Sequence, residues 1–483
     1  MLKKLLAISL ILGLSNIPSY AAVKQNIGNK INEKEYPASE KVLPSNSSES
    51  SVTIEGSVQK NVDMTLDKCI ELALGNNPQI NAAFQDILAS DARIKQVWSN
   101  YFPQVSWQTG YTRIRQLQLS DVLGRNLTFN YYILGQITLQ QMLYDFGVTQ
   151  NQATIKRLDY EGYKATLAGV VNNVIYQTKD AYFALLLAVE NKRVAEDTVH
   201  KFELFYDQAK AFYKIGMNPK VDVTIAEANL SNSKLKLIQA DNAVNLAIAN
   251  LNNIMGVPFI DKYNIQERLD YVPVDITLNK AVDIAREARP ELKLAELKAE
   301  SAKQTVKLVK KSYFPTLSIE GQYQRGGRTW NSNYGYNISG YLNFPTVNGM
   351  LIRNEIKEAR YLYDKELANA QNTQNEIYLE IQNAYLKLNE KRAQIPVAIL
   401  QVKQAKENYE LSYGRYRVGE ASPIELREAQ ITYQEAQLAY YDTLYQYNSS
   451  KAALEKAIGK NIVNEEDVVK LDTTAKSKNT IIV

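Results

Sequence analysis

Apolar and polar residues change their spacing along this chain in a cycle that occurs twice. Each cycle begins with a short segment whose apolar residues lie three or four apart, MTLDKCIELAL or ITLNKAVDIAR, followed by Pro78 or Pro290. Because proline suits the first turn of a helix, a second helix is predicted from it to about residue 100 or 312. The helical spacing stops at the YFP phrases Tyr101–Pro103 and Tyr313–Pro315, since proline cannot continue a helix and favours an extended residue before it.

Beyond each YFP phrase the apolar residues recur at every second position, which predicts two strands in each copy. The strands are about ten residues long or more, with one aromatic or apolar face, as in strands that cross an outer membrane. The alternation alone is also compatible with a soluble sandwich. The apolar faces are assigned Val105, Trp107, Tyr111, Tyr131, Ile133 and Ile137 in the first copy and Leu317, Ile319, Tyr336 and Ile338 in the second, whereas Tyr132 is assigned to the polar face.

Long helices follow the strands. The first is predicted from Gly147 to Ile215 and is about 100 Å long at 1.5 Å per residue. The second, from Asn348 to Val418, contains Pro396, which should kink the helix or divide it into two segments. A returning helix of about 40 residues follows each of them, and helices of this length need partner helices along their apolar stripes. The glycines expected at the tips are Gly216 and Gly419, and those at the ends of the returning helices are Gly256 and Gly459.

The two cycles form an internal repeat. Residues up to the YFP phrases recur after 212 positions, whereas residues of the long helices recur after 203. The first copy therefore carries about nine extra residues, which we expect in a loop. The expected organisation is a flexible extension at 22–63, a first repeat at 64–257, a connector at 258–275, a second repeat at 276–460 and a tail at 461–483, with strand hairpins at about 103–144 and 315–347 and helical tips at about 216–222 and 419–428.

The first 21 residues have the pattern of a signal peptide. Lys3 and Lys4 precede an apolar run, and residues 19–21, Ser-Tyr-Ala, fit a cleavage site. Beyond this segment no run of about 18 apolar residues occurs, so no transmembrane helix is predicted. The single cysteine, Cys69, lies far from the cleavage site, so neither a lipid anchor there nor an intramolecular disulfide is expected.

Composition argues against nucleic-acid binding and against most catalysis. Lys and Arg number 56 and Asp and Glu 52, a balance that does not suit nucleic acid. A single histidine, His200, excludes clustered histidine metal sites and most histidine-dependent acid–base chemistry within one chain. The sequence also lacks a Walker loop, a GxSxG elbow and a Cys-x-x-Cys pair. We therefore predict no enzyme, no cofactor and no metal site.

Four strands per chain cannot close a barrel alone, because the smallest single-chain barrels have about eight. Open strand edges in lipid would leave unpaired backbone groups that cost several kcal/mol each. The chain is therefore predicted to be an obligate oligomer, in which two, three or four copies would supply about 8, 12 or 16 strands. The alternative is a secreted or surface coiled-coil protein without transport activity, which would not explain two hairpins with aromatic faces.

The order of these elements, given twice, resembles the TolC-like outer-membrane factors between Met64 and Lys460. The most specific parts are the YFP phrases and the tips FYKIGMNPKVDVTIAEA, residues 212–228, and RYRVGEASPIELREAQ, residues 415–430. The resemblance implies a mixed α and β membrane protein, a homotrimer with a β-barrel of about 12 strands in the cell outer membrane and a helical barrel across the periplasm. It also implies a passive exit duct for efflux or type I secretion, with a periplasmic adaptor protein and an inner-membrane transporter of RND, ABC or MFS type as partners.

Acidic residues follow each tip glycine. Asp222 lies six residues after Gly216 and Glu425 six after Gly419, and Glu428 shares a helical face with Glu425. In a threefold assembly Glu425 and Glu428 would form a ring of six carboxylates that attracts cations. Alternatively, these acids complement the helix dipole and have no other role.

The resemblance implies a periplasmic gate made by Asp222, Tyr416, Glu425 and Glu428. The arginine that the family has two residues after the second tip glycine is replaced by Ala421, so Arg417 or Arg427 would have to substitute for it. The adaptor-contact tips implied are Gly216, Met217, Asn218, Gly419, Glu420 and Ala421. The predicted membrane-interface markers are Trp98, Tyr101, Phe102, Pro103, Tyr313, Phe314 and Pro315.

Overall fold

The computed structural model describes most of the chain between the two terminal segments. The expected signal peptide and the C-terminal tail lie outside the described residues. Of the expected extension at 22–63, the described part is Val62–Asp63, which forms strand β1 and pairs in parallel with β4, Tyr263–Asn264. These two residues are therefore part of the fold and not of a flexible extension. The described residues are 62–120, 126–217, 219–257, 263–264, 268–327, 333–345 and 350–460.

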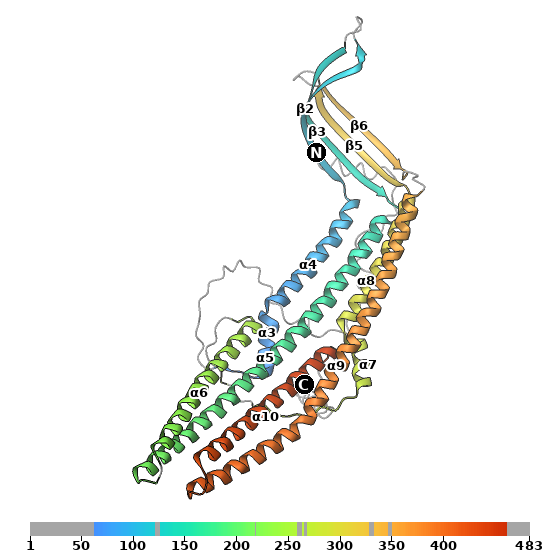
Figure 1. Ribbon diagram of the computed structural model, residues 1–483. Helices are drawn as coiled ribbons and strands as arrows, with labels where there is room; N and C mark the ends of the chain where they lie inside the picture. The colour runs from blue at the N-terminus through green and yellow to red at the C-terminus, as the bar shows by residue number, and fades with distance from the viewer. Residues whose placement is uncertain are drawn as a thin grey trace, which may run out of the picture. The chain divides into compact units, whose positions relative to one another are not determined.

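In the part of the chain that the structure describes, each half contributes four helices in the same order (Figure 1). The bounds repeat at the predicted separations, 212 for the two shorter helices and 203 for the two longer ones. The predicted internal repeat is therefore confirmed by the fold. The first half contains α3 (Leu66–Asn76), α4 (Pro78–Trp98), α5 (Val148–Lys214) and α6 (Lys220–Met255), and the second contains α7 (Leu278–Ala288), α8 (Pro290–Lys310), α9 (Leu351–Arg417) and α10 (Pro423–Ile458).

Helix α9 continues through Pro396 as one helix of 67 residues. A proline has no N–H to donate and its ring crowds the preceding turn, which would weaken an isolated helix here. The helix persists because it packs along α10 and α8. Of the two outcomes expected at Pro396, division into separate segments does not occur.

Four strands form one antiparallel sheet in the order β2-β3-β5-β6. Each hairpin is entered through a short 3₁₀ turn, η1 (Ser99–Tyr101) or η2 (Lys311–Tyr313), after which Phe102 or Phe314 is extended, as expected before proline. The bounds are β2 Gln104–Ser120, β3 Asn126–Tyr144, β5 Thr316–Gly327 and β6 Asn333–Asn343.

The extra residues of the first copy lengthen its strands. Strands β2 and β3 have 17 and 19 residues, whereas β5 and β6 have 12 and 11. The expectation of an insertion in a loop was therefore wrong. Added residues can pair with each other across a hairpin, so that the backbone groups of the longer ribbon remain hydrogen-bonded to each other.

A bulge in β3 between Ile133 and Gly135 changes which side chains share a face. Below the bulge Ile137 pairs with Trp107, as the alternation predicts, but above it Tyr132 pairs with Tyr111. The rings of Tyr111 and Tyr132 lie 5.2 Å apart, whereas the Tyr131 hydroxyl accepts a hydrogen bond from the polar-face Gln324. Ile133 pairs with Gly110, which is also on the polar face. The predicted faces of Tyr131, Tyr132 and Ile133 were thus reversed, because one extra residue in a bulge shifts the period-2 alternation by one position.

Equivalent joints connect the end of each returning helix to the start of the same repeat. Asn77 caps α4 by accepting from the Gln79 N–H at 2.8 Å, and its Nδ2 donates to the Ile254 carbonyl at 2.8 Å near the end of α6. At the matching position Arg289 donates from Nη1 to the Lys456 carbonyl at 2.9 Å near the end of α10. These joints surround the main apolar core, which contains Cys69, Tyr182, Leu251, Met255, Ile381, Leu444 and Tyr447.

Candidate functional site: helix tips and strand-to-helix joints

The first tip joins α5 to α6. Gly216 has φ +76°, a left-handed conformation that ends the helix, and the Met217 N–H donates to the Phe212 carbonyl at 2.9 Å. Met217 is exposed, and Asn218 lies outside the described residues. Asp222 lies in the first turn of α6, where its carboxylate complements the helix dipole.

The second tip, between α9 and α10, repeats this geometry and adds an ion pair. Gly419 has φ +80°, and the Ser422 side chain caps α10 by accepting from the Glu425 N–H at 3.2 Å. Arg415 reaches across the loop and donates from Nη1 to Glu425 at 2.6 Å and from Nη2 to the Glu420 carbonyl at 3.4 Å. Arg415 therefore holds both sides of this tip together.

Arg415 was not identified from the sequence as a gate residue. Arg427 pairs with Glu428 at 3.1 Å, and no hydrogen bond joins Arg417 to another described residue. The ten-residue separation between Arg415 and Glu425 gives no periodic signal, because the chain turns back between them. Both acids of α10 that the sequence predicts for the gate thus have an arginine partner within the same chain.

Tyr416 is buried, with 4% of its surface exposed, in an apolar cluster that joins the two helical hairpins. Phe202 and Phe205 of α5 and Leu426 of α10 form the cluster with it, and its ring lies 6.3 Å from that of Phe212. Burial raises the pKa of the Tyr416 phenol, and the negative charge of Asp222 raises it further. The structure thus brings Tyr416 close to Asp222, with the phenol protonated at neutral pH.

A set of stacked tyrosines continues from this cluster between α5, α9 and α10. Tyr409 stacks on Tyr413 and on Tyr433, with ring centroids 6.2 and 5.8 Å apart. The Lys201 ammonium lies 4.7 Å from the Tyr433 ring and 5.2 Å from the Tyr409 ring. Burial, with nearby negative charges, raises the pKa of Tyr409 to about 12. Aromatic side chains therefore pack between α5, α9 and α10 next to the cluster that contains Tyr416.

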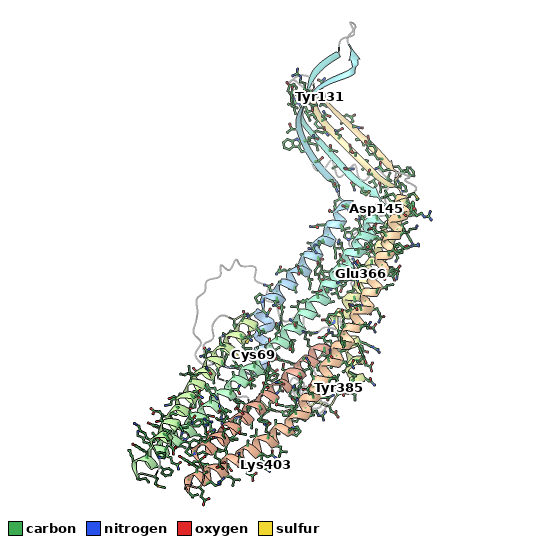
Figure 2. All side chains as sticks on the ribbon, in the orientation of Figure 1. Cys69, Tyr131, Asp145, Glu366, Tyr385 and Lys403 are labelled. Atoms are coloured by element: carbon green, nitrogen blue, oxygen red, sulfur yellow. The ribbon has the colours of Figure 1, made fainter. Side chains whose placement is uncertain are left out.

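The strand-to-helix joint after β3 is organised by Asp145, which is 2% exposed. Asp145 lies where the sheet meets the helices (Figure 2). One carboxylate oxygen accepts from the Tyr101 hydroxyl at 2.6 Å and from the Gly147 N–H at 3.0 Å, and the other accepts from the Thr149 N–H at 2.6 Å. Burial alone would raise the pKa of Asp145, but these hydrogen bonds hold it below its usual value.

Both YFP phrases reach this joint. Tyr101 of the first phrase binds Asp145, whereas Phe314 of the second stacks on Phe146 with ring centroids 5.3 Å apart. Lys311, just before the second phrase, donates to the Gly147 carbonyl at 2.7 Å. The joint was not found from the sequence, since its contacts connect residues 44 and 164 positions apart.

Asp145→Asn should destabilise the protein by about 2 kcal/mol at neutral pH, because charge-assisted hydrogen bonds to a buried carboxylate are lost. Asparagine is the residue at the matching position 348 of the second repeat. Because the pKa of Asp145 is lower in the folded state than in the unfolded state, its ionised carboxylate stabilises the fold. This contribution is complete above the unfolded pKa of about 4 and is lost as the pH falls through the folded pKa. Urea unfolding at pH 7 and pH 3 should therefore show that the difference between wild type and variant shrinks in acid. Asp159→Asn, in an exposed ion pair, is the control. A difference of equal size at both pH values would contradict the assignment.

The predicted interface markers surround this joint. Phe102, Tyr313 and Phe314 are more than half exposed, and Trp98 is exposed with its ring 6.1 Å from that of Tyr101. Tyr101 differs from the other interface markers, because its hydroxyl donates a hydrogen bond to Asp145. Pro103 and Pro315 directly precede the first strand of each hairpin, β2 and β5.

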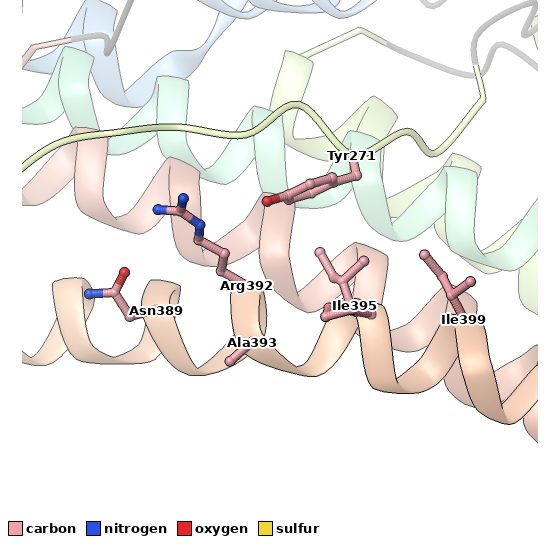
Figure 3. A pocket seen from close by; sticks show the side chains of 7 residues that line it. Tyr271, Asn389, Arg392, Ala393, Ile395 and Ile399 are labelled. Atoms are coloured by element: carbon pink, nitrogen blue, oxygen red, sulfur yellow. The ribbon is translucent and has the colours of Figure 1, made fainter.

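An open groove of about 560 Å³ lies where the connector before α7 crosses α9 (Figure 3). Its charged lining residue, Arg392, donates to the Val274 carbonyl at 3.4 Å and so holds the connector. Among the described residues, no group of three His, Cys, Asp or Glu side chains could hold a metal ion. The described helices include no segment apolar enough over its length to cross a membrane. The groove is lined by Tyr271, Asn389, Arg392, Ala393, Ile395, Pro396 and Ile399.

Comparisons with known proteins agree with this geometry. The family model described as outer membrane efflux protein matches residues 69–257 and 281–460, one match in each repeat. Protein CyaE of Bordetella pertussis is 24% identical over 82% of this chain and 84% of its own length. The antibiotic efflux pump outer membrane protein ArpC of Pseudomonas putida is 21% identical over 92% of both chains. The outer membrane channel CmeC of Campylobacter jejuni has a similar fold, with a TM-score of 0.71 at 19% identity over 88% of this chain and 93% of that one.

Proposed function

Because the chain belongs to the outer membrane efflux protein family, it is an outer-membrane channel with a periplasmic helical extension, and we propose that three copies close one continuous duct. It serves as the efflux channel of a tripartite efflux or type I secretion system and is not an enzyme. The alternative of a structural coiled-coil protein is therefore rejected. The partners proposed are a periplasmic adaptor and an inner-membrane transporter.

The observation that carries the trimer proposal is the open sheet. Strands β2 and β6 are its edges, and each lacks a neighbouring strand on one side among the described residues. Because adjacent strands alternate in direction, β6 of one copy would lie antiparallel to β2 of the next, and closure leaves no unpaired edge in lipid. Three copies give a barrel of about 12 strands, within the range of known outer-membrane barrels.

The outermost helices support the same closure. Helices α6 and α9 flank α5 and α10, and each carries an exposed apolar stripe that no described element covers. Two such stripes would cover each other between neighbouring copies. The residues are Leu235, Ile238 and Leu246 of α6 and Leu379, Leu386 and Leu400 of α9, each at least 53% exposed.

Leu400→Glu should abolish the trimer, because it would bury three unpaired carboxylates per assembly at a cost of several kcal/mol each. Gel electrophoresis of unboiled membrane extracts should show an SDS-resistant trimer for wild type and monomer for this variant. Leu204→Glu is the matched control, since Leu204 is exposed on the inner helix α5. A stable Leu400→Glu trimer, or a wild-type protein that runs as a dimer or tetramer, would refute the proposed assembly.

We further propose that Asp222, Tyr416, Glu425 and Glu428 close the periplasmic end and that the two tips contact the adaptor. Opening requires the α9–α10 hairpin to move from α5. At the other end of the seam between α5 and α10, Lys179 and Glu455 form a buried ion pair of 2.6 Å. Near the tips, the buried amide of Gln430 has no hydrogen-bond partner among the described residues. This difference supports separation that begins at the tips, because an unsatisfied buried amide weakens the seam there.

The proposed acid ring is less negative than six free carboxylates would be. Arg415 neutralises much of the charge of Glu425, and Arg427 that of Glu428. Cation attraction at the closed end should therefore depend on whether these pairs persist in the assembled trimer. Gly216, Met217, Gly419, Glu420 and Ala421 are the described tip residues proposed to meet the adaptor.

A further inference from the structure

The helical segments next to the strands hold the chain's surplus of positive charge. We define a membrane-proximal collar as residues 90–98, 148–160, 300–311 and 351–361, the parts of α4, α5, α8 and α9 that adjoin the sheet (Figure 1). The collar contains eleven Lys and Arg but five Asp and Glu. Because the whole chain has 56 and 52, the remainder is slightly acidic and the surplus is confined to the collar.

The positive charges form two stripes on neighbouring helices. Lys303, Lys307 and Lys310 of α8 are spaced by four and three residues, and Arg353, Lys357 and Arg360 of α9 repeat that spacing. Each spacing places its three residues on one helical face, and α8 packs against α9. All six residues are exposed.

Most of these charges are available to an external anion. Lys303 pairs with Glu300 at 3.2 Å, but the other five form no hydrogen bond or ion pair with a described residue. Uncompensated positive charges concentrated on the collar repel each other, so an anionic partner would stabilise the collar.

Exposed aromatic rings lie between the collar and the strands. Phe102 is 67% exposed and Phe314 51%, and each directly precedes the proline at which a hairpin starts. Basic residues followed by exposed aromatic rings are typical of the boundary between lipid headgroups and acyl chains. The partner suggested by this arrangement is a lipid surface, because a soluble anion would not require the rings.

We propose that the collar binds the headgroups of anionic phospholipids in the periplasmic leaflet of the outer membrane. The proposal rests on the trimeric channel proposed above, which would carry three copies of each stripe around its circumference. Lipid phosphates then neutralise the stripes while the aromatic rings enter the acyl boundary. The attraction is electrostatic and therefore decreases as the salt concentration rises.

The test uses the trimer reconstituted into vesicles, with Trp98 as the reporter after Trp107 and Trp330 are changed to phenylalanine. Quenching of Trp98 by brominated phosphatidylglycerol is compared with quenching by brominated phosphatidylcholine, which gives the relative binding of the two lipids. We expect phosphatidylglycerol to be preferred at least about twofold at low salt, and less at high salt. The variant Lys307→Gln, Lys310→Gln, Lys357→Gln should bring the preference close to parity.

A matched variant removes the same charge away from the membrane. Lys293→Gln, Lys403→Gln, Lys406→Gln changes exposed lysines of the same two helices and should keep the wild-type preference. Equal binding of both lipids to wild type, or an unchanged preference in the collar variant, would overturn the proposal. A collar variant that instead alters the ratio of cation to anion permeability would show that the stripes face the lumen and would also overturn it. Conductance and SDS-resistant trimers are measured on each preparation, so that a failure of the trimeric channel is distinguished from a failure of lipid binding.

Discussion

Replacing Asp222 by alanine together with Tyr416 by phenylalanine should raise the single-channel conductance several-fold in planar bilayers and admit large antibiotics to cells. The Tyr416 hydroxyl lies within the cluster that joins the two hairpins, close to the charge of Asp222. Removing the hydroxyl and the charge while keeping the ring removes the two polar groups proposed for the gate but retains the apolar packing. We expect the trimer to remain intact and the α9–α10 hairpin to separate from α5 at the tips.

A control pair tests whether position or composition matters. Tyr413→Phe with Asp207→Ala removes the same hydroxyl and the same charge at other positions. Tyr413 lies about one helical turn from Tyr416, and Asp207 lies on α5, about two turns before the first tip. Tyr413 stacks within the tyrosine layer, and Asp207 is exposed. The control should conduct like wild type. Wild-type conductance in the Asp222 and Tyr416 variant, or an equal increase in the control, would show that these two residues do not form the gate.

Gly256→Ala should destabilise the protein more than the same substitution at the other glycines that end helices. Gly256 has φ +68°, which costs an ordinary residue about 1–2 kcal/mol, and its added Cβ would lie 2.5 Å from the backbone oxygen of Asn76. Backbone cannot move aside as a side chain can, so overpacking adds about 1–3 kcal/mol. We expect a loss of about 2–5 kcal/mol in urea unfolding and little SDS-resistant trimer.

The equivalent glycines provide a graded control. At Gly459 an added Cβ would lie 3.1 Å from the Ala288 oxygen, and at Gly216 it would meet nothing within 4 Å, although both have positive φ. The loss should therefore decrease from Gly256→Ala to Gly459→Ala to Gly216→Ala. If all three variants lose the same stability, backbone strain alone is responsible and the close approach of Gly256 to Asn76 contributes nothing.

Much of the fold could be predicted from the sequence because its signals are local. Pro78 and Pro290 start helices, Gly216 and Gly419 end them, and the period changes at the YFP phrases. Each signal depends on residues within one or two turns, where backbone sterics and apolar spacing act. The resemblance to the TolC-like factors then supplied the channel function, which periodicity could not.

The site was predicted less completely. The resemblance to the TolC-like factors implied Asp222, Tyr416, Glu425 and Glu428 as gate residues, but nothing local indicated that Arg415 would bind Glu425. The reversed faces of Tyr131 and Tyr132 have a similar origin, since a bulge is visible only when the partner strand is in place.

The sequence by itself determined the elements, their order and their twofold repetition, because helix and strand periods and Pro and Gly boundaries are properties of neighbouring residues. The tertiary structure alone decided which distant residues meet. In the structure Asp145 binds both Tyr101 and the start of α5. Lys179 pairs with Glu455, although 276 positions separate them in the sequence. Such contacts depend on how helices and strands pack against each other, and no spacing along the chain records that packing.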